Sequence, residues 1–141
     1  RLNPHLTVLT LGVDDLERSV AFYRDGLGWA TKGIVGQEFE WGAAAFFNLA
    51  GGLKLALWPR RSMAAETGLQ WGPPDPTALA LGHNVASTAA VDEVLRQAAA
   101  AGAQICKSAG PTFWGGYAGW FQDPDGHLWE VVYNPHLAAL G

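Results

Sequence analysis

The first half of the chain carries several hydrophobic patterns in succession. Residues 6–11 are apolar with threonines interspersed, which is typical of a β-strand. After an Asp-Asp pair suited to cap a helix, apolar residues recur at helical spacing over 16–27, where glycines end the pattern. Residues 37–49 and 53–58 are strand-like, and the Gly-Gly pair between them predicts a hairpin. This half therefore predicts a strand, a helix and about three further strands.

The second half repeats that order. Residues 79–87 are strand-like, and a Ser-Thr pair can cap a helix over 88–101. A short strand at 103–107 follows, and residues 117–122 and 127–133 predict a hairpin. The Asp-Pro-Asp-Gly turn between the last two strands suits that hairpin, because proline fixes φ at the second position and glycine tolerates a positive φ.

The two halves can be laid on each other. Val13 then falls on Val85, and residues 52–57 fall on 126–131. The repeated order of elements favours an internal duplication over a chance run of α+β elements. We expect one domain, residues 1–141, with modules at about 5–60 and 77–135, a linker at about 61–76, and a tail from Tyr133 that packs on its own domain or on a partner subunit.

Composition narrows the function. A net charge of -4 with 16% charged residues offers no basic surface for nucleic acid. No apolar run approaches the ~20 residues that cross a bilayer, and no secretory signal is recognisable, so we expect a cytoplasmic protein. The single cysteine, Cys106, excludes an internal disulfide, and we expect a small buried residue in preference to a reactive thiol.

Two motifs point to a known family. LGVDDLERSVAFYRDGLGW (residues 11–29) resembles the opening strand and helix of the vicinal oxygen chelate superfamily, and WGGYAGWFQDPDGHLWEVVYNP (residues 114–135) resembles its closing hairpin. This superfamily includes glyoxalase I, extradiol dioxygenases, fosfomycin-resistance enzymes and bleomycin-binding proteins. The resemblance implies an α+β fold of two βαβββ modules, whose curved mixed sheets enclose a cleft. It also implies a homodimer, as in the bleomycin-binding branch.

The metal ligands of the family are largely missing from this chain. Carried over residue by residue, the ligand positions of metal-dependent members fall on Val8, Ala56, Ala80 and Glu130, and only Glu130 can bind a metal. Catalytic transition-metal sites typically use about three protein ligands. We therefore expect no metal and no cofactor, with a metal-dependent protein of atypical ligand set as an alternative.

The histidines do not replace the missing ligands. His5 and His83 lie three residues from Val8 and Ala80, so that strand alternation places them on the opposite face. His127 falls in the predicted turn, and the fourth histidine falls in the tail.

The remaining cleft residues are aromatic or polar. Seven tryptophans lie along the chain, and several fall on predicted strands or loops beside the cleft. Glu130 has two interpretations: it can take a proton or hold a cationic ligand, or it can pair with a basic side chain or backbone N–H groups. The predicted ligand-binding residues are Trp58, Trp114, Tyr117, Trp120, Gln122 and Glu130, with Glu130 as the candidate catalytic residue.

These residues support two hypotheses of different class. The first is metal-independent binding of a small, partly aromatic or cationic molecule in an aromatic-lined cleft. The second is a glyoxalase-like lyase or isomerase in which Glu130 acts as general base.

Overall fold

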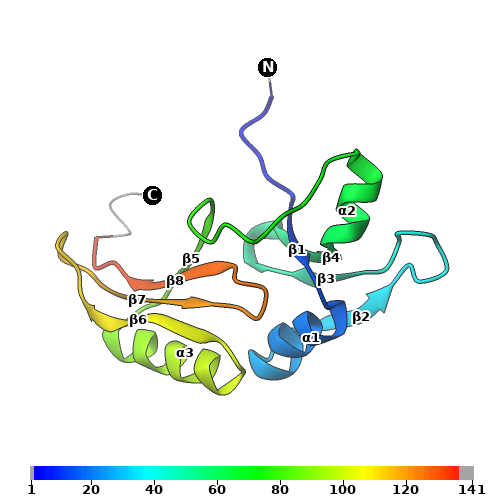
Figure 1. Cartoon of the computed structure of the whole chain (residues 1–141). Helices are drawn as coiled ribbons and strands as arrows, with labels where there is room; N and C mark the ends of the chain where they lie inside the picture. Colours follow the sequence, from blue (N-terminus) through cyan, green and yellow to red (C-terminus); the bar gives the residue numbers. More distant parts are fainter. Residues whose placement is uncertain (1, 137–141) are drawn as a thin grey trace. The chain divides into compact units, whose positions relative to one another are not determined.

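Each half of the chain folds into a four-stranded mixed sheet with a helix on one face (Figure 1). The computed structural model describes residues 2–136, and the chain divides into two compact units between Pro73 and Pro74. Much of the predicted tail, residues 137–141, lies outside the described residues.

The first unit has the strand order β1-β4-β3-β2, in which β1 and β4 are parallel and the other pairs antiparallel. Helix α1 continues directly into the π-helical segment η1, and helix α2 follows the last strand without a gap. The elements are β1 (Val8–Val13), α1 (Leu16–Val20), η1 (Ala21–Gly26), β2 (Thr31–Val35), β3 (Ala44–Asn48), the 3-10 turn η2 (Ala50–Gly52), β4 (Lys54–Pro59) and α2 (Arg60–Thr67).

The second unit repeats this topology. Its strand order is β5-β8-β7-β6, again with the first pair parallel and the others antiparallel. Its elements are β5 (Ala80–Asn84), α3 (Thr88–Ala100), β6 (Gln104–Pro111), β7 (Tyr117–Gln122) and β8 (Leu128–Tyr133). The matching orders confirm the predicted α+β fold of two βαβββ modules.

Local signals in the sequence set the helix and turn boundaries. Asp15 caps α1 by accepting a hydrogen bond from the Arg18 N–H at 3.1 Å, and Ser87 caps α3 in the same way. In the predicted hairpin turn, the Gly126 N–H donates to the Asp123 carbonyl at 2.9 Å. The predicted caps and turn are thus confirmed.

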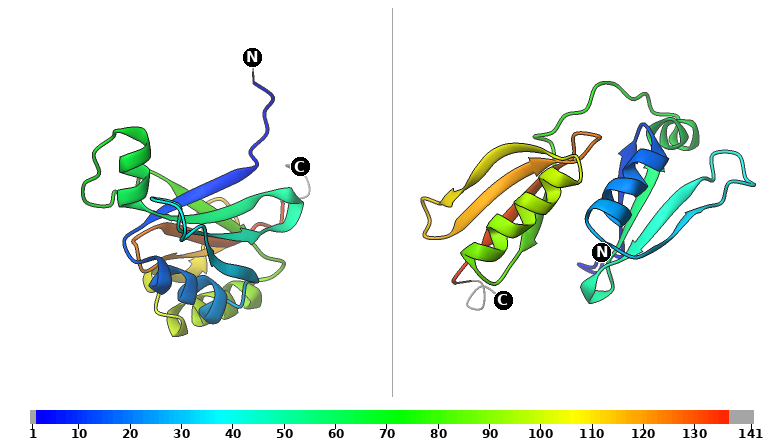
Figure 2. Two further views of the ribbon diagram at one scale, coloured as in Figure 1. Left: turned by 90° about the vertical axis from the view of Figure 1, so that its right-hand side faces the viewer. Right: turned by 90° about the horizontal axis from the view of Figure 1, so that it is seen from below.

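Figure 2 shows α1 and α3 each lying against one face of its own sheet. Strand alternation directs the side chains of that face into a core beneath the helix. In the first unit, Leu11, Leu57 and Ala45 pair across three strands and are all buried. In the second unit, α3 contributes the buried residues Val91, Leu95 and Ala98, which face the buried residues Phe121, Trp129 and Val131 of β7 and β8.

Two local predictions were wrong. The alternating residues 38–41 form a loop, and the missing strand is β2, at Thr31–Val35. Gly36 and Gly42 explain the loop, because a Cβ at Gly42 would lie 2.5 Å from the Gly36 carbonyl oxygen. Such a close backbone approach closes the chain into a turn, which overrides the alternating pattern. The predicted linker at about 61–76 begins within α2 and contains the division between the two units.

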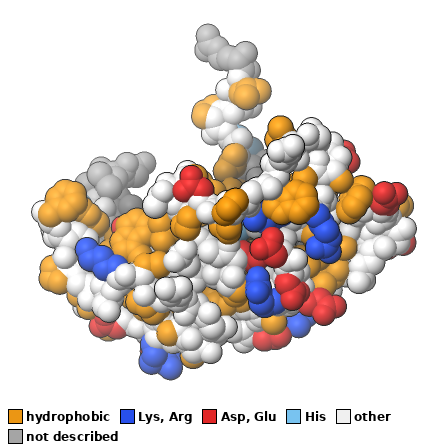
Figure 3. Space-filling model, viewed as in Figure 1, with side chains coloured by type: hydrophobic (Ala, Val, Ile, Leu, Met, Phe, Trp, Pro, Cys, Tyr) orange, Lys and Arg blue, Asp and Glu red, His pale blue; other side chains and the backbone are white. Residues whose placement is uncertain are grey.

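The surface of the described residues is mixed in character. Lys and Arg side chains lie scattered among acidic and hydrophobic ones on the face shown in Figure 3. No helix within residues 2–136 combines the length and apolar character that a membrane span requires.

Two strand glycines provide a matched test of this packing. A Cβ at Gly119 would lie 2.3 Å from Leu95 Cδ1 and 3.1 Å from the Ala109 nitrogen, whereas a Cβ at Gly82 meets nothing within 4 Å. We expect Gly119→Ala to lower the free energy of unfolding by about 1–3 kcal/mol through overpacking. Gly82→Ala should stay within about 0.5 kcal/mol of the native protein. Urea denaturation of both variants checks this, and equal stability of the two would contradict the packing described for α3.

Candidate functional site

The sheet of the second unit has one face covered by α3 and a second face that we call the α3-distal face. In β8, Trp129 and Val131 are 5% and 0% exposed, whereas Glu130 between them is only half-buried. The ring of Trp129 stacks on Phe121 with centroids 6.0 Å apart. Because these residues occupy the core beneath α3, alternation directs Glu130 to the α3-distal face.

Glu130 lies in the middle of a row of three residues across the sheet. It pairs with Trp120 of β7 on one side and with Gly82 of β5 on the other. Side chains paired in this way lie about 4.5–5.5 Å apart at Cβ. Gly82 has no side chain, and the space above it is open to at least 4 Å. The row therefore places a carboxylate between an indole ring and an empty position.

The Glu130 carboxylate has no hydrogen bond or ion pair with any other residue among 2–136. The interpretation of Glu130 as one half of a structural ion pair therefore finds no support within the described residues. A half-buried carboxylate without a protein partner retains all of its lone pairs for a ligand.

Gln122 lies on the same face, one row from Trp120. Its side-chain amide donates to the Gly126 carbonyl at 3.2 Å, and its Oε1 lies 3.4 Å from Cys106 Sγ. Cys106 is exposed, so the expectation of a buried residue was wrong. The physical reason is its position on β6, the edge strand of the sheet, where the pairing with β7 shifts register.

Tyr117 belongs to the other face of β7. Tyr117 and the buried Phe121 lie on the same face of β7, the face covered by α3. The Tyr117 hydroxyl donates a hydrogen bond to Asp92 Oδ1 of α3 at 2.8 Å. This hydrogen bond, together with burial and the Asp92 charge, raises the pKa of Tyr117 above the ordinary tyrosine value of 10.0. The structure does not bring Tyr117 beside Glu130, and its role in ligand binding stays a prediction.

Trp114 occupies the loop between β6 and β7. Its ring lies against Gly116, where a Cβ would be 2.1 Å from the indole, and the Gly116 N–H donates to Thr112 Oγ1 at 2.8 Å. The indole is 39% exposed, so Trp114 presents an aromatic surface to solvent.

Trp58 lies in the first unit, on β4. It shares its parity with Ala56 and so belongs to the face of the first sheet that points away from α1, which we call the α1-distal face. The indole N–H of Trp58 donates to the Trp41 carbonyl at 2.9 Å. This contact anchors the loop before β3.

A metal site of the kind that the resemblance implies does not fit these residues. Thr10 lies opposite Ala56, and Gly82 lies opposite Glu130, so a shift by one row on β1 or β5 brings in neither a histidine nor a carboxylate. Within residues 2–136, no group of three or more His, Cys, Asp or Glu side chains is arranged to hold a metal ion.

His83 follows Gly82 directly in β5, and strand alternation turns it to the opposite face of the sheet. It pairs with Val131, which is fully buried on the side of α3, and thus faces away from Glu130. Burial lowers the pKa of His83 below the ordinary histidine value of 6.5. The imidazole thus lies half-buried on the α3 side of the sheet and takes no part in the row that contains Glu130.

Comparisons with known proteins identify the family and the fold of the chain. A family model described as the Glyoxalase/Bleomycin resistance protein/Dioxygenase superfamily matches residues 4–131. A glyoxalase-related enzyme from Fulvimarina pelagi is 34% identical, with a TM-score of 0.80 over 94% of this chain and 90% of that one. A glyoxalase/bleomycin resistance protein/dioxygenase from Nocardioides is 25% identical, with a TM-score of 0.75 over 94% of this chain and 85% of that one.

A more distant structure shares the fold. The fosfomycin resistance protein FosX from Listeria monocytogenes is 22% identical, with a TM-score of 0.69 over 94% of this chain and 95% of that one. No match was found among curated proteins.

The burial of His83 predicts a pH dependence of stability. Its pKa is lower in the folded chain than in the unfolded one, so the unfolded chain binds the proton more readily. The contribution of His83 to stability is complete above about pH 6.5 and is lost as the pH falls through the folded pKa. We expect His83→Gln to flatten the fall in unfolding free energy in this range, measured by urea denaturation. His136→Gln, at an exposed position, is the control, and an equal effect of both variants would refute the assignment.

Proposed function

Because the chain belongs to the glyoxalase/bleomycin resistance protein/dioxygenase superfamily, we propose that it binds a small, partly aromatic, cationic molecule on the α3-distal face without a metal ion. The observation that carries this proposal is the row Gly82–Glu130–Trp120. Glu130 supplies a carboxylate that has no partner among residues 2–136, Trp120 supplies an aromatic surface beside it, and Gly82 leaves room for the ligand.

The chemistry of the row favours a cation. A charge-assisted hydrogen bond to a carboxylate is roughly twice as strong as a neutral one, and the face of an indole ring attracts positive charge. An amine seated over Gly82 would therefore interact with both Glu130 and Trp120. The homodimer and the cytoplasmic location that we expect from the sequence stay predictions. The proposed binding of a cation does not depend on either of them.

The second candidate is a metal-free lyase or isomerase, which the same carboxylate favours. With its lone pairs unused, Glu130 can accept a proton from a carbon next to a carbonyl group. Solvent deuterium exchange into a small carbonyl compound such as dihydroxyacetone would distinguish the two. Exchange that requires Glu130 favours the enzyme, and its absence favours the binding protein.

The proposal predicts a binding pattern for two matched probes, 2-phenylethylamine and the neutral 2-phenylethanol. We expect the native protein to prefer the amine, and Glu130→Gln to weaken amine binding by about tenfold while leaving the alcohol unchanged. Gly82→Leu fills the open position and should weaken both probes. Titration calorimetry measures these affinities. Equal binding of amine and alcohol by the native protein would exclude Glu130 as the anchor.

Metal independence has its own test. We expect Zn²⁺, Ni²⁺, Mn²⁺ and Fe²⁺ to leave the tryptophan fluorescence unchanged, and the protein to be purified without stoichiometric metal, because Val8, Ala56 and Ala80 offer no ligands. Elemental analysis and fluorescence titration check this. One tightly bound ion per chain, lost in Glu130→Gln, would overturn the metal-free proposal.

A further inference from the structure

A recess lies within the first unit, on the α1-distal face and at the end of the sheet that is far from α2. It has a volume of ≈ 480 Å³. The register places it at the Lys54–Asn48 end of the sheet, whereas α2 packs over Gly12 at the opposite end. We call this recess the lysine pocket. Its lining includes Thr31, Lys32, Val35, Phe46, Asn48 and Lys54.

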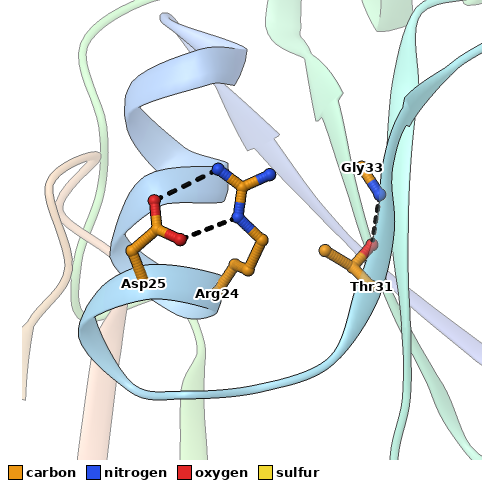
Figure 4. Close-up of polar contacts among 4 residues, drawn as sticks. All are labelled: Arg24, Asp25, Thr31 and Gly33. Carbon is orange, nitrogen blue, oxygen red and sulfur yellow. Dashed lines mark hydrogen bonds and ion pairs between the residues drawn. The ribbon is translucent and has the colours of Figure 1, made fainter.

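A bulge in β2 shapes the wall of the lysine pocket. The pairing of β2 with β3 shifts between Thr31 and Ile34, and Gly33 adopts a φ of +86° that few other residues accept. The Thr31 hydroxyl fixes this bulge, since it donates to the Phe46 carbonyl at 2.6 Å and accepts from the Gly33 N–H at 3.2 Å. Figure 4 shows the Thr31–Gly33 contact beside the paired side chains of Arg24 and Asp25.

The charge of the lysine pocket is unbalanced. The chain has three lysines, and Lys32 and Lys54 both line this one recess. None of its lining residues is acidic, and neither lysine forms an ion pair with another residue among 2–136. Arg24 and Arg96, by contrast, pair with the neighbouring carboxylates of Asp25 and Glu93. In a chain of net charge -4, this recess is a local concentration of positive charge that has no ion-pair partner among residues 2–136.

The pocket also presents apolar surface. Phe46 is 45% exposed and Val35 is 42% exposed, both on the side away from the core. Asn48 lies directly opposite Lys54 and adds an amide that can donate hydrogen bonds. Two cations and an amide around an exposed phenyl ring match an organic anion with an apolar body better than a bare inorganic anion, which would leave Phe46 and Val35 uncovered.

We propose that the lysine pocket is a binding site for a small aromatic carboxylate, whose carboxylate lies between Lys32 and Lys54 and whose ring covers Phe46. The argument for this site uses residues of the first unit alone and none of the row Gly82–Glu130–Trp120.

The test uses 2-naphthoate and its neutral analogue 2-naphthylmethanol, with the whole chain and with amide chemical-shift titration as the readout. We expect the native protein to bind 2-naphthoate about tenfold more tightly, with shifts centred on β2 and β3. Lys32→Met and Lys54→Met should each weaken 2-naphthoate about three- to fivefold, since each removes one exposed ion pair. The double variant should bind both probes equally.

Two controls make the outcome decisive. Lys107→Met removes the remaining lysine, which lies on β6 of the second unit, and should leave binding unchanged. The 2-phenylethylamine titration of the same native protein reports on the proposed function separately, so that failure of one proposal is distinguishable from failure of the other. The proposal is overturned if the native protein fails to bind 2-naphthoate or does not distinguish the two probes, or if Lys107→Met weakens binding as much as the pocket variants do. Competition by inorganic phosphate at equal concentration would also overturn it, because that result would leave no role for the aromatic surface.

Discussion

In each unit, a helix covers one face of a twisted sheet, and the two-residue alternation of the strands then determines where every other side chain points. Trp129 and Val131 fill the core beneath α3, so Glu130 must face away from it. A slip of β8 by one residue would bury the Glu130 carboxylate under α3 and expose Trp129. Burying an unpaired charge and exposing an indole are both costly, so core packing holds the register that positions the candidate site.

Features that depend on neighbouring residues could be predicted from the sequence. The Ser87 cap of α3 and the turn at Asp123 follow from side-chain oxygens that accept hydrogen bonds from backbone N–H groups within a few residues. The duplicated topology followed from the repeated order of such elements. The regular alternation of β8 also predicts that Glu130 faces away from Trp129 and Val131. That Trp120 lies on the same face as Glu130 follows only from the register of β7 with β8.

Features that depend on irregular backbone geometry could not be predicted from the sequence. Strand β2 was missed because Lys32 and the Gly33 bulge interrupt its apolar alternation, and the same bulge shapes the lysine pocket. The exposure of Cys106 depends on register shifts between β6 and β7 that no local pattern encodes. The lysine pocket itself joins residues of three strands, and its only signal in the sequence is that lysines are scarce.

The same separation of faces explains how the fold accommodates residues other than metal ligands at Val8, Ala56 and Ala80. The cores depend on residues such as Leu11, Leu57 and Val131, which face the helices. Val8 and Ala80 lie on the distal faces, where they support no core packing, so a residue other than a metal ligand there leaves each sheet intact. The two sheets share one topology, but the side chains on their distal faces differ in charge, which is basic at Lys32 and Lys54 and acidic at Glu130. Membership of the superfamily accounts for the common scaffold, and a fold by itself does not identify a ligand.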